Sequence, residues 1–359
     1  MKRSLALSAG IALAIPLALT GTAATAAPAP PPPQVRAENL VSPLKLAVDV
    51  GGSIYVTQNF AGQLTKIARD GTQTPLYTSE NGAEVGGVSA FLGTVYFTET
   101  VIDPNIGPVE SYLKKIDRHG NVSDLADIRA YENQANPDAK AQYGFTDLPA
   151  DCLAQVPAQI PGSYAGIQDS HPYATLGTPI GTVVADAGSN ALFTVDRAGK
   201  VRTLAVLPPQ PYVVDEAALA LGLPECAIGY TYNFEPVPTD VELGPDGWLY
   251  VSLLPGGPEG PELGARGAVV KVNLLNGKVV PVASGLVTAT DLAVSPRGDI
   301  YVAQLFGPHI GVIKKGTSEA VPFREATQGA AVEWGTKGIY ATVNALSDPP
   351  AGQVVLLPF

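Results

Sequence analysis

The sequence predicts an all-β protein, a six-bladed β-propeller whose ring is closed by an N-terminal strand that completes the last blade. The main observation is a short phrase that occurs six times, in which a glycine turn precedes β-branched and aromatic residues. Such a phrase is typical of a short buried strand. Each of the first five copies precedes a second expected strand that ends in a charged glycine turn. Repeats of about 40 to 50 residues with four short strands are typical of propeller blades. The copies lie at residues 52–57, 93–98, 181–186, 247–252, 298–303 and 337–342.

The first residues predict export. Lys2 and Arg3 precede an apolar run at 5–19, which is short for a membrane span, and the small residues 24–26 form a cleavage site. We therefore expect a secreted, extracytoplasmic protein. The predicted organisation is a signal peptide at 1–26, an Ala/Pro-rich linker at 27–33 and the propeller at 34–359.

The two ends of the propeller segment are complementary. The last repeat ends one strand short, while residues 34–48 resemble 281–294, where an outer strand leads into the next blade's inner strand. Residues near 34–41 are therefore expected to complete the sixth blade. Closure of this kind leaves no unpaired sheet edge exposed to aggregation.

Charge excludes two classes of partner. The formal net charge of the whole chain is −11, and Lys and Arg are not clustered anywhere. Nucleic acids and anionic lipid surfaces both select for clustered basic residues, so neither is an expected partner. No stretch after the signal peptide is long and apolar enough to predict a membrane span. We expect a monomer.

The chain has two cysteines, Cys152 and Cys226. In an exported protein they predict one disulfide, although two separate buried thiols are the alternative. Neither cysteine has a second ligand or a base at a diagnostic spacing, so a metal or nucleophile role has little support.

The repeats are interrupted on one side only. Short glycine turns link the strands at one end of each expected blade, whereas longer segments gather at the other end. Long loops on a rigid scaffold are common places for binding and catalysis. This loop-rich face should carry two insertions at about 129–170 and 209–235, with one cysteine in each, and enlarged loops at about 100–110, 254–267 and 344–352.

The chain resembles the ScyD/ScyE family, secreted six-bladed propellers related to NHL and TolB-like propellers. The likeness is carried by Pro172-Tyr173 and by the segments 183–206 and 235–252, together with the two cysteine-bearing insertions. His171 stands where the resemblance would place an Asn before Pro-Tyr. The resemblance implies the fold and export, and it implies no established activity.

Candidate functional residues are polar side chains at strand ends on the loop-rich face, around the expected channel mouth. Carboxylate and amide oxygens are ligands for Ca²⁺, which six-bladed lactonases hold in such a place and which can polarise an ester or lactone carbonyl. Asp240 and Asp291 occupy matching Thr-Asp phrases, so a structural hydrogen bond to neighbouring backbone is the alternative for both. The candidate ligand-binding residues are Asp240, Asp291, Asp186, His171, Tyr173, Glu99, Gln58, Gln304 and His309, and the candidate metal ligands are Asp240, Asp291 and Glu99.

Two functions stay open, and with them the question whether the chain is an enzyme. The first is an exported binding or scaffold protein that holds a small molecule, a glycan or a partner protein on the loop-rich face. The alternative is a Ca²⁺-dependent lactonase or esterase-like hydrolase at the channel mouth. A serine hydrolase has little support, because the sequence has no Gly-x-Ser-x-Gly. No cofactor is predicted, and Ca²⁺ would belong to the hydrolase alone.

Overall fold

The computed structural model describes residues 30–260 and 262–359. The predicted signal peptide at 1–26 and the start of the predicted linker lie outside the described residues. Within them, no helix is long and apolar enough to cross a membrane. The fold is all-β, as predicted, and it consists of four-stranded antiparallel sheets with few helices.

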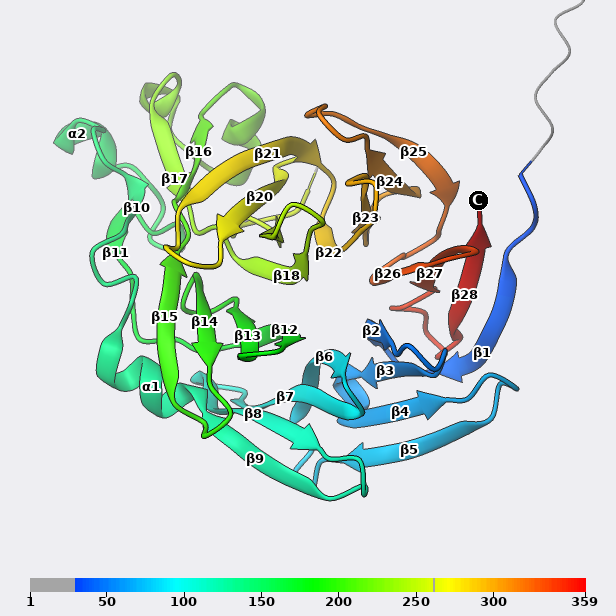
Figure 1. The fold of residues 1–359 in the computed structure, drawn as a ribbon. Helices are drawn as coiled ribbons and strands as arrows, with labels where there is room; N and C mark the ends of the chain where they lie inside the picture. Colours follow the sequence, from blue (N-terminus) through cyan, green and yellow to red (C-terminus); the bar gives the residue numbers. More distant parts are fainter. Residues whose placement is uncertain (1–29, 261) are drawn as a thin grey trace, which may run out of the picture. The chain divides into compact units, whose positions relative to one another are not determined.

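Six of the sheets follow one pattern, in which the repeated phrase forms the second strand from the centre (Figure 1). The first two are β2 (Pro43–Val48), β3 (Ile54–Gln58), β4 (Gln63–Ile67) and β5 (Gln73–Thr78), then β6 (Glu84–Phe91), β7 (Thr94–Asp103), β8 (Gly107–Ile116) and β9 (Val122–Asp127). The next two are β12 (Pro172–Thr178), β13 (Gly181–Asp186), β14 (Ala191–Val195) and β15 (Val201–Val206), then β18 (Pro238–Leu243), β19 (Trp248–Leu253), β20 (Gly267–Asn273) and β21 (Val279–Leu286). The last two are β22 (Ala289–Val294), β23 (Ile300–Gln304), β24 (His309–Ile313) and β25 (Ala320–Glu325), then β26 (Val332–Gly335), β27 (Gly338–Val343), β28 (Gly352–Pro358) and β1 (Gln34–Leu40).

The N-terminal strand β1 pairs with the C-terminal strand β28, from Gln34 opposite Leu356 to Leu40 opposite Gly352. The six innermost strands, β2, β6, β12, β18, β22 and β26, each contact the next one along the chain, and β26 also contacts β2. Figure 1 shows these strands gathered around a common centre.

Apolar side chains fill the spaces between neighbouring sheets. The aromatic residue of the repeated phrase contributes to this packing: Tyr55 of β3 packs with Val85 and Phe97 of the next sheet. Its hydroxyl reaches the turn before the strand and donates to Asp49 at 3.0 Å. Tyr250 repeats the contact with Asp246, also at 3.0 Å. In both repeats, the tyrosine ring therefore packs in the core while its hydroxyl binds the turn before the strand.

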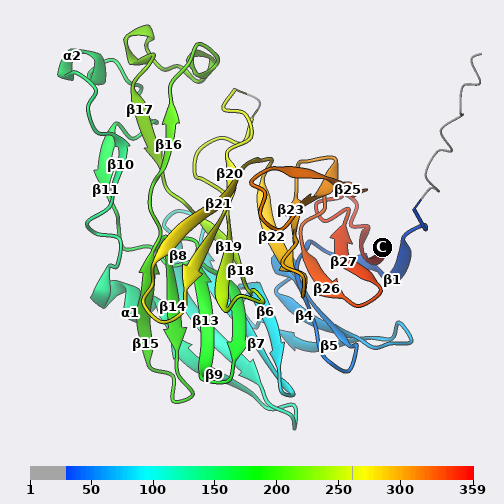
Figure 2. The ribbon, with the colours of Figure 1, turned by 45° about the horizontal axis from the view of Figure 1, so that its top comes forward.

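A seventh sheet was not predicted. The two segments expected as irregular insertions pair with each other in the order β11 (Ser163–Ala165), β10 (Gln142–Phe145), β17 (Thr231–Phe234) and β16 (Gln210–Val213). We call it the insertion sheet. Figure 2 shows it standing above β13–β15. The short helices are α1 (Ile128–Ala135), α2 (Ala150–Leu153), η1 (Asn59–Ala61), η2 (Ala217–Leu221) and η3 (Glu225–Ala227).

The predicted disulfide is confirmed. Cys152 of α2 and Cys226 of η3 are joined by an S–S bond, with their Cα atoms 5.9 Å apart. The bond lies beside the apolar core of the insertion sheet, which includes Phe145 and Tyr232. It therefore ties the two halves of this sheet together.

One expected loop is largely extended structure. In the segment 100–110, β7 continues to Asp103 and β8 begins at Gly107, so a long hairpin replaces the enlarged loop. Thr100, Val101 and Ile102 continue the β-branched run of β7, which favours pairing.

Candidate functional site

A buried lysine lies where the innermost strands meet. Lys45 of β2 is 2% exposed, and its Nζ donates to the backbone oxygens of Thr239 at 2.6 Å and Thr290 at 2.8 Å. The same Nζ lies 2.8 Å from Asp291 Oδ2 and 3.4 Å from Asp240 Oδ1. We call Lys45, Asp240 and Asp291 the central cluster. Its lysine reaches β18 and β22, which belong to sheets that do not neighbour its own.

Sequence reasoning missed Lys45, although the signal was present. In the strand registers, Lys45 faces Thr57, Asp240 faces Ser252 and Asp291 faces Ala303. Each partner is the penultimate residue of its strand. Lys45 therefore occupies the same repeat position as the two aspartates, and a charge of opposite sign at that position was the available clue.

Each aspartate of the central cluster also bridges two sheets. Asp240 Oδ2 accepts a hydrogen bond from the backbone N–H of Leu292 at 3.1 Å, and Asp291 Oδ1 accepts one from that of Val332 at 3.0 Å. These bonds match the structural alternative stated for the two residues. Burial alone would lower the pKa of Lys45, but Asp240 and Asp291 raise it above its usual value. The ammonium is therefore charged, and both carboxylates serve as its partners.

The predicted metal ligands do not come together. Lys45 fills the place between Asp240 and Asp291 that a Ca²⁺ ion would take. Glu99 of β7 belongs to another contact set, with Tyr77 and, at 3.2 Å, Lys114. Among the described residues, no three acidic, histidine or cysteine side chains have an arrangement that could hold a metal. The residues present therefore do not fit Ca²⁺ in the predicted way.

Two further carboxylates lie on the innermost strands. Glu242 is two residues after Asp240 on β18, so it shares a face of the strand, and Glu333 lies on β26. Burial, followed by repulsion from Glu333, raises the pKa of Glu242 well above its usual value. The centre of the fold is thus richer in carboxylates than in ammonium groups.

His171 and Tyr173 lie beside the central cluster. His171 Nε2 is 2.9 Å from Glu84 Oε2, and the His171 ring packs edge-on against Tyr173 at 5.6 Å between centroids. The Tyr173 ring in turn lies 5.2 Å from Lys45 Nζ. Burial lowers and Glu84 raises the pKa of His171, with a net rise. Because the His171 side chain is 28% exposed, solvent reaches this pair.

Other predicted site residues serve the backbone. Asp186 is fully buried and accepts hydrogen bonds from Ser170 Oγ at 2.7 Å and from the N–H groups of residues 171, 188 and 189. Gln58 accepts from the N–H of Val41 at 2.7 Å, and Gln304 accepts from that of Val287 at 2.8 Å. Each amide fixes the chain just before the innermost strand of its own sheet. His309 is the first residue of β24, and it takes part in none of the ion pairs among the described residues.

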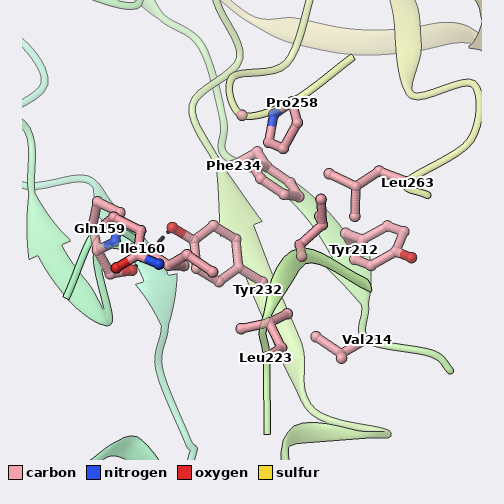
Figure 3. A pocket seen from close by; sticks show the side chains of 12 residues that line it. Gln159, Ile160, Tyr212, Val214, Leu223, Tyr232, Phe234, Pro258 and Leu263 are labelled. Carbon is pink, nitrogen blue, oxygen red and sulfur yellow. Dashed lines mark hydrogen bonds between the residues drawn. The ribbon is translucent and has the colours of Figure 1, made fainter. Parts of the chain in front are cut away.

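An apolar hollow lies on the insertion sheet and not at the centre. It has a volume of about 320 Å³. Figure 3 shows aromatic and aliphatic side chains from both insertions turned toward it, with Pro258 and Leu263 opposite. Among the described residues, no charged side chain lines it. The lining residues are Gln159, Ile160, Pro161, Tyr212, Val214, Leu221, Leu223, Tyr232, Phe234, Gly257, Pro258 and Leu263.

Both tyrosine hydroxyls of this apolar pocket are already engaged. Tyr212 Oη donates to Asp215 at 3.0 Å, and Tyr232 Oη donates to the backbone oxygen of Pro161 at 3.0 Å. The rest of the lining consists of rings, aliphatic chains and the side-chain amide of Gln159. Sequence reasoning missed the pocket, because no motif marks residues that converge only when two distant insertions pair.

Arg266 fixes one wall of the apolar pocket. Its guanidinium stacks on Phe234 with Cζ 4.3 Å from the ring centroid. Its nitrogens donate to the backbone oxygens of Gly256 at 2.8 Å and Pro258 at 2.7 Å. The guanidinium therefore joins the segment 255–258 to Phe234 of β17 beside the pocket.

Comparisons with known proteins support the fold. No protein-family model and no curated protein matches the chain. Among solved structures, it is similar to a gluconolactonase from Xanthomonas campestris, with a TM-score of 0.55 at 11% identity over 94% of this chain and 99% of that one. It is also similar to the PQQ-bound aldose sugar dehydrogenase of Streptomyces coelicolor (TM-score 0.53, 13% identity, 91% and 99% covered). A third similar structure is the calcium-binding protein regucalcin of Agrobacterium tumefaciens, with a TM-score of 0.53 at 11% identity over 91% of this chain and 95% of that one.

These similarities place the chain among β-propellers. At such low identity they show the fold alone, and their activities differ from one another. The resemblance to the ScyD/ScyE family stays a prediction.

Proposed function

We propose that the chain is an exported β-propeller binding protein that holds a small apolar molecule in the pocket of its insertion sheet. The observation that carries this proposal is a hollow of about 320 Å³ with aromatic walls and no charged lining side chain among the described residues. Small-molecule sites are typically concave, mostly apolar and about 300 to 1,000 Å³ in volume.

The scaffold in this proposal is a ring of six blades closed by β1. The pairing of β1 with β28 and the contacts between successive innermost strands, including β26 with β2, support it. A closed ring is a rigid base for the insertion sheet, whose two halves leave it between β9 and β12 and between β15 and β18.

The Cys152–Cys226 disulfide supports the proposed export of the protein. Disulfides persist in oxidising compartments and are rare in the cytosol, and Cys152–Cys226 lies beside the core from which the apolar pocket is built. A reducing compartment would remove this cross-link from the proposed site.

The lining chemistry selects among the expected ligands. A glycan would need hydrogen-bonding groups free to meet its hydroxyls, whereas both tyrosine hydroxyls of the apolar pocket already have partners. A lining of aromatic rings and aliphatic chains, with one amide from Gln159, favours a flat or branched apolar molecule, which gains free energy by leaving water. Docking of a partner protein is the weaker proposal, since the feature is a hollow and not an extended surface.

The test uses the uncharged fluorophore N-phenyl-1-naphthylamine with the purified mature chain. We expect saturable fluorescence enhancement that the variant Leu223→Trp abolishes, because the indole fills the pocket. Leu275→Trp is the matched control, since Leu275 is 92% exposed on a turn between β20 and β21. Equal enhancement in all three proteins would refute the pocket as the binding site.

The Ca²⁺-dependent hydrolase stays as a second candidate because of the partly exposed His171–Glu84 pair at the centre. A histidine held by a carboxylate is a plausible proton carrier. Its Ca²⁺ would have to bind elsewhere than between Asp240 and Asp291, which Lys45 occupies. Turnover of aliphatic lactones or aryl esters that disappears in His171→Gln would establish it, and no turnover in the intact chain would remove it.

A further inference from the structure

We propose that the Lys45 ammonium is the resident cation of the central cluster, and that its removal leaves an oxygen-lined site for a divalent cation of the Ca²⁺ class. The inference is independent of the ligand proposed for the apolar pocket. It concerns the centre of the fold, where the predicted metal and the observed residues disagree.

The surroundings of Lys45 Nζ are those of a cation site. Four oxygens from two strands lie at 2.6 to 3.4 Å: the carbonyls of Thr239 and Thr290 and the carboxylates of Asp240 and Asp291. No nitrogen or sulfur atom is among these partners. Hard divalent cations such as Ca²⁺ select such oxygen sets, with carboxylates and backbone carbonyls together.

The oxygen cage is held by the scaffold and not by the lysine alone. Each carboxylate keeps one oxygen for Lys45 and gives the other to a backbone N–H, of Leu292 for Asp240 and of Val332 for Asp291. Both aspartates are buried, at 7% and 3% exposed. Truncation of Lys45 therefore leaves four oxygens directed at a space that the side chain had filled.

The charge balance favours a replacement of higher charge. Two aspartates face a single ammonium, and Glu242 and Glu333 interact electrostatically with the same aspartates. Without Lys45, buried carboxylates must take up protons or attract another cation. A divalent ion satisfies this charge better than a monovalent one.

In the intact chain, a lysine in the central cluster behaves differently from a bound metal ion. A tethered ammonium cannot be chelated or lost, and it offers no open coordination position to a substrate. The intact chain should therefore be insensitive to chelators at its centre.

The experiment compares the intact mature chain with Lys45→Ala and Lys45→Met. The probe is Tb³⁺, an oxygen-seeking stand-in for Ca²⁺ whose luminescence is sensitised by nearby tyrosine, and the Tyr173 ring lies 5.2 Å from the lysine nitrogen. We expect no tyrosine-sensitised signal from the intact chain and strong signal from Lys45→Ala. Excess Ca²⁺ should displace Tb³⁺, and the melting temperature of Lys45→Ala should rise with Ca²⁺. Lys45→Met keeps the volume without the charge, so its signal should be much weaker.

Two results would overturn the proposal. One is a Ca²⁺ or Tb³⁺ signal in the intact chain that Asp240→Asn removes, because Lys45 would then not be the resident cation. The other is a folded Lys45→Ala chain with no response to either ion. If Lys45→Ala is unfolded without metal, its circular dichroism after refolding in Ca²⁺ or in chelator gives the answer. A β-sheet spectrum in Ca²⁺ only supports the proposal, whereas an unfolded spectrum in both contradicts it.

Discussion

The central cluster and the apolar pocket differ in whether their side chains have partners. The charged groups of the central cluster are paired with one another, whereas the apolar walls of the pocket surround a hollow. At the centre, the Lys45 ammonium pairs with both Asp240 and Asp291, and these ion pairs join three sheets. On the insertion sheet, rings and aliphatic chains surround a hollow of about 320 Å³. The convergent polar residues therefore serve the structure in one region, while the apolar hollow is the proposed binding site in the other. Removing a central charge should threaten the fold, whereas changing the apolar pocket should alter binding alone.

The largest effect is expected from Lys45→Met. It leaves two buried carboxylates without their cation, which should reduce the free energy of unfolding by about 3 to 5 kcal/mol. Denaturant unfolding of the mature chain in the absence of divalent ions measures this. Lys140→Met, at an exposed position among the described residues, is the control. Equal stability of the two variants would mean that the central cluster is not structural.

Loss of the disulfide should act mainly on the insertion sheet. The double variant Cys152→Ser, Cys226→Ser opens a link between residues 74 apart, which should cost about 2 to 4 kcal/mol. Limited proteolysis should cut first within 142–165 or 210–234, while the six sheets around the centre stay protected. Uniform cleavage across all sheets would show that the insertion sheet does not unfold separately.

Arg266→Met tests the pocket wall. The variant loses the stacking on Phe234 and three hydrogen bonds to the segment 255–258, so fluorophore affinity should fall about tenfold, or about 1.4 kcal/mol. Fluorescence titration measures the change. Arg202→Met removes an arginine that is 57% exposed, and it should bind as the intact chain does. The pocket model fails here if both variants bind equally well.

The smallest effect concerns pH. The folded pKa of His171 is raised, so the His171–Glu84 pair should stabilise the fold fully below about pH 6.5 and lose this contribution as pH rises through the folded pKa. Burial raises the pKa of Glu84, but its contact with His171 lowers the pKa by more. The contribution of the Glu84 carboxylate to stability is therefore lost only as the pH falls into the acid range. His171→Gln should therefore cost about 1 kcal/mol near pH 6 and less near pH 9. Unfolding curves at both values measure this, with exposed His119→Gln as control. A cost that is equal at both pH values would contradict the ion pair.

Repetition made the sheets predictable from sequence. A phrase such as 298–303 carries its own turn glycine followed by a buried β-branched and aromatic run, so its structure depends little on distant residues. The resemblance of 34–48 to 281–294 likewise indicated the strand β1, which pairs with β28. The insertion sheet could not be found in this way, because Gly144 and Asn233 pair across a separation that no local pattern records.

The candidate site was predicted only in part, for a physical reason. Asp240 and Asp291 were recognised as convergent, but their partner Lys45 comes from the first repeat, where an apolar strand concealed one charged residue. Glu99 was grouped with them by strand position, and its side chain pairs with Lys114 instead. The position of a residue within a repeat therefore predicts where in the fold it lies better than it predicts which side chain it contacts.

The most direct test of the account is a crystal structure of the mature chain soaked with N-phenyl-1-naphthylamine. We predict the naphthyl group between Tyr232, Phe234 and Leu263, with Lys45 Nζ still held by its four oxygens. A ligand bound at the centre, with Lys45 displaced from Asp240 and Asp291 and the pocket of the insertion sheet empty, would contradict it.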